Sequence, residues 1–115
     1  MKIKEIKLSE YGHNDSCVEA KDGENVYPLI KQAINEDFQV KLLFSDIKTL
    51  TTAFLNTAIG QIYGEFSEEE VKSHLSVDEI SNAQAITLKR VIDTAKQYYN
   101  NPDALQNSIN DILDE

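Results

Sequence analysis

Residues 40–66, VKLLFSDIKTLTTAFLNTAIGQIYGEF, constrain the fold more than any other part of the chain. An apolar run ends at Ser45-Asp46, and two threonines, Thr51 and Thr52, follow after a short linker. The apolar residues beyond them repeat at i, i+3, i+4 and i+7, which is the spacing of a helix with one buried face. They are Leu55, Ala58, Ile59 and Ile62. The segment therefore predicts a buried strand that leads through a tight turn into a helix, with a hydroxyl group at the helix start.

The two threonines support more than one interpretation. A hydroxyl at the start of a helix beside a sheet edge is suited to binding an anion, accepting a phosphate or contacting a partner. Alternatively, Thr51 or Thr52 is simply the N-cap of the helix, a role that contributes about 1 kcal/mol to stability. Phe54 also has two interpretations, since it either packs in the core or projects as an aromatic anchor for a partner.

The hydrophobic pattern of the whole chain predicts a small α/β fold with a mixed sheet of about four strands covered by helices. The strands are expected near residues 3–8, 17–20, 38–44 and 75–80. The strand at residues 38–44 is apolar almost throughout, which is typical of a central strand buried on both faces.

Local signals place the helices between these strands. Asn25 is the expected N-cap of the first helix, because Pro28 then falls within the first turn, where proline is tolerated. Ser67 and Glu70 have the spacing of a capping box. A long helix is expected from residue 81 or 82 to about Asn100.

A further helix is expected after Asn101-Pro102-Asp103. It gives the chain an extra C-terminal helix, so that residues 1–100 form one domain and residues 101–115 a helical extension. The extension is acidic with a narrow apolar stripe, and it either packs on its own domain or pairs with another chain. Pairing through this helix would make the protein a homo-oligomer.

Composition disfavours several classes of function. Eleven basic residues against twenty acidic ones give a net charge of −9, which repels nucleic-acid phosphates and anionic lipid. It is compatible with a basic protein partner, or with a charge that only keeps the protein in solution. No apolar run approaches the roughly 20 residues needed to span a bilayer. We therefore expect a cytoplasmic protein that binds neither nucleic acid nor membrane.

The sequence offers little for catalysis or metal binding. The glycines are isolated, so no glycine-rich phosphate loop is predicted. The single cysteine, Cys17, is expected to be an inert thiol, and with two distant histidines, His13 and His74, it provides no zinc-site spacing. We expect no enzymatic activity, no metal and no cofactor.

The order of elements around the two threonines resembles the STAS domain of sulphate transporters and anti-sigma-factor antagonists. In antagonists, a strand ends in a Leu-Ser-Gly-Val-like turn, and an Asp-Ser-Ser-Gly motif with a phosphorylatable serine follows. Residues 44–47, Phe-Ser-Asp-Ile, match the turn, which places Thr52 on the phosphorylatable serine and Thr51 on the preceding aspartate. Two hydroxyl residues, a small residue and then Phe54 are more similar to the bacterial STAS-like domain of uncertain function. In that group a Ser-Ser-Phe-like segment opens the same helix.

The resemblance implies a non-catalytic regulatory module that docks on a protein partner, a histidine-kinase-like ATPase or a kinase. The residues implied in partner binding or a phosphorylation switch are Ser45, Asp46, Thr51, Thr52 and Phe54. Any ATP would belong to the partner. The alternative function is a small domain that binds an anionic ligand or nucleotide at the same helix start.

Overall fold

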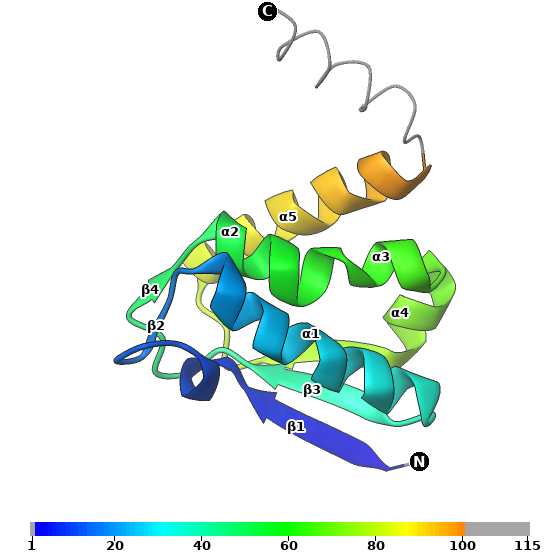
Figure 1. Ribbon diagram of the computed structural model, residues 1–115, viewed down its shortest axis with the longest axis horizontal. Coiled ribbons are helices and arrows are strands. Elements are labelled where there is room, and N and C mark those ends of the chain that lie inside the picture. The colour runs from blue at the N-terminus through cyan, green and yellow to red at the C-terminus, as the bar shows by residue number, and fades with distance from the viewer. Residues whose placement is uncertain (1, 101–115) are drawn as a thin grey trace, which may run out of the picture.

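The computed structural model describes residues 2–100, and its strands form two parallel sheets (Figure 1). The first sheet has the order β1-β3-β5, with β1 (Ile3–Lys7) and β5 (Leu75–Asp78) on either side of β3 (Gln39–Leu43). The second sheet pairs β2 (Ser16–Cys17) with β4 (Thr49–Leu50). The predicted small α/β fold is confirmed, but its strands divide between two sheets with parallel pairing, where one mixed sheet was expected.

The central strand has one buried face rather than two. Val40 and Leu42 are fully buried on one face, and Lys41 and Leu43 on the other face remain partly exposed. Parallel strands need long crossover connections. Here α1 connects β1 to β3, and the helical segments α2 to α4 connect β3 to β5.

Most of the helical structure lies over the first sheet as stacked segments. A continuous helical run from α2 to α3 lies between α1 and α5 (Figure 1). Its middle part, η2, is a π-helical segment packed on α1. The helical elements are η1 (Leu8–Tyr11), α1 (Ala20–Asn35), α2 (Thr52–Leu55), η2 (Asn56–Gly60), α3 (Ile62–Glu65), α4 (Glu68–His74) and α5 (Asn82–Asn100).

The first helix begins six residues earlier than it would with the predicted N-cap, Asn25. Its N-cap is Glu19, whose backbone is extended, and Pro28 lies in the helix interior on an exposed face. The early start places Gly23 in the first turn of α1, beside α2. A Cβ atom at Gly23 would lie 2.5 Å from the carbonyl oxygen of Phe54, so glycine allows the first turn of α1 to approach α2 closely.

The two downstream helix starts agree with the sequence. Ser67 and Glu70 form the predicted capping box. The hydroxyl of Ser81 accepts a hydrogen bond from the backbone N–H of Gln84 at 3.1 Å, and the Gln84 side chain accepts one from the N–H of Ser81. These reciprocal bonds satisfy the N–H groups that a helix start leaves without intrahelical partners.

No helix in residues 2–100 is both long enough and apolar enough to cross a membrane. The helix expected after Asn101, and with it the proposed extension at residues 101–115, lies outside the described residues.

Candidate functional site

The second sheet holds the start of α2 in place. Main-chain hydrogen bonds join the β4 segment to the β2 segment on both sides of the pair: Lys48 N–H to Asp15 O at 2.8 Å, and Thr51 N–H to Cys17 O at 3.1 Å. The predicted linker between the central strand and the helix is therefore partly a strand. We call residues 48–53 the docking edge.

Thr51 is the N-cap of α2. Its hydroxyl accepts a hydrogen bond from the backbone N–H of Phe54 at 3.2 Å and donates one to the carbonyl of Val18 at 2.6 Å. Of the two interpretations weighed for the threonines, the capping role is confirmed for Thr51. Because both bonds occupy the hydroxyl, Thr51 ties the helix start to the segment that follows β2.

Thr52 is the first residue of α2, and its side chain is exposed. Its hydroxyl makes no hydrogen bond to any residue in the described part of the chain. Ala53 beside it is also exposed. The helix start thus presents one hydroxyl that is used in folding and one that is available to solvent.

Phe54 is not an exposed anchor. Its side chain is 0% exposed and belongs to the hydrophobic core. The core interpretation is confirmed, and the expectation that Phe54 contacts a partner is wrong because no part of its side chain reaches the surface. The helical spacing explains this, since Phe54 lies beside Leu55 and one turn before Ala58 on the face that packs inward.

Ser45 and Asp46 form the turn after β3, as expected. Asp46 has a φ of 62°, a left-handed conformation that aspartate adopts more readily than most residues. Its carboxylate accepts a hydrogen bond from the Lys7 ammonium at 2.8 Å, which joins the turn to the end of β1. This bond raises the pKa of Lys7 above its ordinary value. Ser45 is half-buried.

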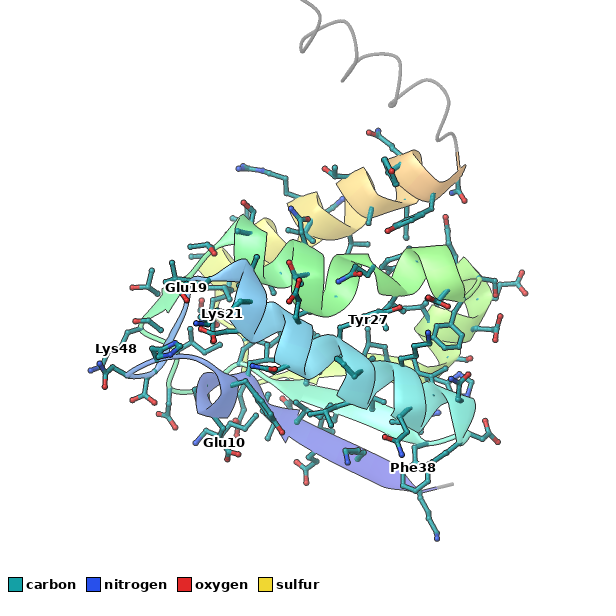
Figure 2. The ribbon with its side chains drawn as sticks, in the orientation of Figure 1. Glu10, Glu19, Lys21, Tyr27, Phe38 and Lys48 are labelled. Atoms are coloured by element: carbon teal, nitrogen blue, oxygen red, sulfur yellow. The ribbon has the colours of Figure 1, made fainter. Side chains whose placement is uncertain are left out.

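A shallow hollow lies beside the docking edge. It has a volume of about 290 Å³, and Ile47, Lys48 and Leu50 face the start of α5 across it. Figure 2 shows Lys48 projecting from the end of the molecule that also carries Glu19. A separate groove of about 520 Å³ lies between α4, β5 and α5.

Cys17, which the sequence predicted to be an inert thiol, is fully buried. Its thiol donates to the carbonyl of Leu8 at 3.4 Å. Burial raises the pKa of Cys17 to about 11, and the nearby Asp22 carboxylate adds to this shift. A protonated, enclosed thiol is a poor nucleophile.

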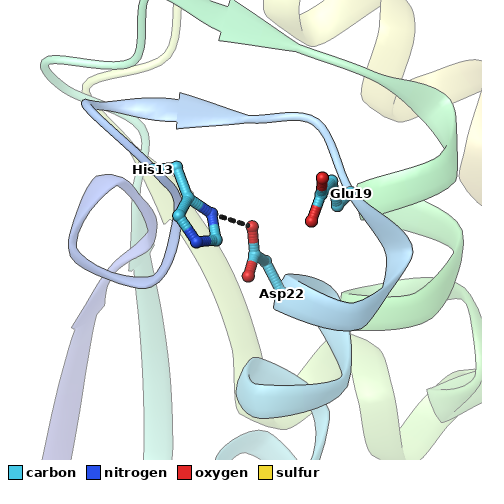
Figure 3. Close-up of side chains that lie close together, drawn as sticks. All are labelled: His13, Glu19 and Asp22. Carbon is cyan, nitrogen blue, oxygen red and sulfur yellow. Dashed lines mark hydrogen bonds and ion pairs between the residues drawn. The ribbon is translucent and has the colours of Figure 1, made fainter.

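The structure also brings together three side chains that the sequence pattern did not connect: His13, Glu19 and Asp22 (Figure 3). His13 Nδ1 lies 2.8 Å from Asp22 Oδ2. The early start of α1 makes this arrangement possible, because Glu19 and Asp22 then share its first turn. The expected strand at residues 17–20 and helix start at Asn25 concealed it. The Asn14-Asp15 pair could have indicated this cluster, because it is suited to a tight turn that brings His13 close to the residues that follow the turn.

A family model describes a STAS-like domain of unknown function (DUF4325) and matches residues 22–85, more than half of the chain. No curated protein and no solved structure matches the chain. The matched segment runs from the first turn of α1 to the first turn of α5, and so it contains β3, the docking edge and α2. This chain therefore belongs to the family of STAS-like domains of unknown function.

Proposed function

We propose that this STAS-like domain is a non-catalytic regulatory module that binds a protein partner through the docking edge. The proposal rests on the difference in hydrogen bonding between the two threonines. Thr51 is engaged in capping and in the bond to Val18, whereas Thr52 is exposed and free of hydrogen bonds to the described residues. A side chain released from folding in this way is available for recognition or modification.

The surroundings of Thr52 are better suited to contact with a partner protein than to binding of a small molecule. The edge is an exposed segment of short strand and helix start, and the neighbouring hollow is shallow and open to solvent. A drug-sized ligand is usually enclosed over most of its surface. A partner would instead lie across the edge and use the hollow to receive one of its side chains.

A histidine-kinase-like ATPase or a kinase is the proposed partner, on the basis of the similarity to anti-sigma-factor antagonists. Phosphorylation of Thr52 would add close to two negative charges to a chain whose net charge is already −9. Such a charge at the centre of the contact would repel acidic groups of the partner and favour release. The nucleotide would be bound by the partner.

The proposal is tested by measuring the affinity of the domain for the histidine-kinase-like ATPase encoded nearest to its own gene. Thr52→Glu places a negative charge at the edge, and we expect it to weaken binding by about tenfold or more, equivalent to about 1.4 kcal/mol. Thr94→Glu is the matched control, since Thr94 is an exposed threonine on α5. We expect it to leave the affinity within about twofold.

Thr52→Ala separates docking from switching. Loss of affinity in both Thr52 variants would mean that the hydroxyl itself contacts the partner, and loss in the glutamate variant alone would indicate a charge switch. Equal affinities for the wild type, Thr52→Ala and Thr52→Glu would show that residue 52 has no part in the interaction.

A further inference from the structure

We propose that His13, Glu19 and Asp22 form a binding site for one divalent transition-metal ion, with Zn²⁺ as the best match. The three residues each offer a ligand atom, and these atoms lie within 4.8 Å of one another. Figure 3 shows the imidazole and the two carboxylates directed toward a common space beside the first turn of α1.

The backbone positions the imidazole from outside the helix. His13 and Ser16 form an antiparallel bridge, with His13 N–H to Ser16 O at 3.0 Å and Ser16 N–H to His13 O at 2.9 Å. Asn14 and Asp15 between them have φ values of 51° and 63°, as in the two-residue turn of a tight hairpin. The turn presents His13 opposite the helix, so the three side chains come from two different segments of the chain.

Asp22 is the most informative member of the cluster. Its side chain is 5% exposed, whereas that of His13 is 68% exposed. Burial of a carboxylate is costly unless it is paired. Within residues 2–100, His13 is the one side chain that pairs with this carboxylate, and it engages only Oδ2. The other oxygen remains available to a ligand.

The local charges also favour a cation. Glu19 adds a second carboxylate to the cluster. Glu19 is the N-cap residue of α1, but its side chain makes no capping hydrogen bond. In the described part of the chain, neither Glu19 nor Asp22 forms an ion pair with a lysine or arginine. The helix dipole stabilises a carboxylate in the first turn. It does not explain why two carboxylates lie together with an imidazole from another segment.

The ligand atoms would have to move closer together to hold an ion. Zn²⁺ binds imidazole nitrogen and carboxylate oxygen at about 2.1 Å in tetrahedral geometry, so two ligand atoms lie about 3.4 Å apart. The ligand atoms here lie within 4.8 Å of one another and would converge by up to about 1.4 Å, which the exposed Glu19 and His13 side chains can supply by rotation. An imidazole ligand favours Zn²⁺ over Mg²⁺ and Ca²⁺, which prefer oxygen. Solvent would complete the coordination.

The test is calorimetric titration of the full chain, carrying no histidine tag, with Zn²⁺. We expect one equivalent to bind the wild type, with a rise in Tm, and we expect His13→Gln and Glu19→Gln each to weaken binding by about tenfold or more. Both substitutions change exposed side chains, so the fold is retained.

Two matched variants control for other sites. His74→Gln removes the other histidine, which pairs with a single carboxylate, that of Asp37. Glu24→Gln removes an exposed glutamate elsewhere on α1. Both should bind Zn²⁺ as the wild type does. The proposal is overturned if the wild type binds no stoichiometric Zn²⁺, or if His13→Gln and Glu19→Gln bind as tightly as the two controls. Displacement of Zn²⁺ by an equal concentration of Mg²⁺ would show that the site does not select a transition metal.

Discussion

At the scale of single residues, the two adjacent threonines have different roles, and a stability measurement can separate them. Thr51→Ala removes the N-cap and the bond to Val18, so we expect a loss of about 1–2 kcal/mol in the free energy of unfolding. Thr52→Ala changes an exposed side chain without described hydrogen bonds, and we expect a change within about 0.5 kcal/mol. Urea unfolding of both variants checks this. A larger loss for Thr52→Ala than for Thr51→Ala would contradict the assignment of the cap.

His74 provides a second test at this scale. Its Nε2 lies 2.8 Å from Asp37 Oδ1, and its Nδ1 lies 2.8 Å from the carbonyl of Glu70. Both oxygens are acceptors, so the protonated ring, which donates from both nitrogens, fits best. The bond to Asp37, followed by the bond to the Glu70 carbonyl, raises the pKa of His74 above 6.5.

Because the pKa is higher in the folded state, the pair stabilises the fold fully below about pH 6.5. This stabilisation is lost as the pH rises through the raised pKa. We expect Asp37→Asn to lower the pKa of His74 toward 6.5, as followed by NMR titration of the ring protons. Asn is a suitable replacement because Asp37 has a φ of 62°, which asparagine also tolerates. An unchanged pKa in this variant would exclude the ion pair as the cause.

At the scale of elements, the close contact between α1 and the α2–η2 run depends on Gly23. A Cβ atom there would lie 2.5 Å from Phe54 O and 3.0 Å from Ala58 N, which are backbone atoms that cannot easily move. We expect Gly23→Ala to destabilise the protein by about 1–3 kcal/mol through overpacking.

Gly60 in η2 is the matched control for Gly23. A Cβ atom at Gly60 would meet its nearest neighbour, in the Asn56 side chain, at 3.7 Å, which is ordinary van der Waals contact. We expect Gly60→Ala to be neutral or to stabilise the protein by up to about 1 kcal/mol, because alanine restricts the unfolded chain. Thermal unfolding of both variants gives the comparison. Equal effects would mean that the approach of the two helices does not depend on Gly23.

The sequence predicted correctly those elements whose position depends on residues close together in the chain. The capping box at Ser67 and Glu70 depends on four consecutive residues, and it is present. The start of α1 was misplaced because the local signal of Asn25 and Pro28 was followed, whereas contact between Gly23 and α2 favours an earlier start. The pairing of β2 with β4 joins short segments far apart in the chain. The sequence did not predict this pairing, because a strand of two residues is too short to show hydrophobic alternation.

At the scale of the whole molecule, the sequence predicted the candidate site only in part. Thr51 and Thr52 lie at the helix start as expected, and Asp46 lies in the turn before it. Phe54 is buried because it lies beside Leu55 and one turn before Ala58, on the helix face that packs inward. The cluster of His13, Glu19 and Asp22 was missed because His13 lies near the other two residues only when the hairpin turn and the helix are both in place.

We propose that a partner covers the docking edge of this domain. An NMR titration of the isotope-labelled domain with the ATPase encoded nearest to its gene tests this directly. We expect the largest changes at the backbone amides of Thr49, Thr52 and Ala53, which lie on the exposed edge. Changes centred instead on Lys72 and Val77, in the groove between α4, β5 and α5, would show that the docking edge is not the partner-binding surface.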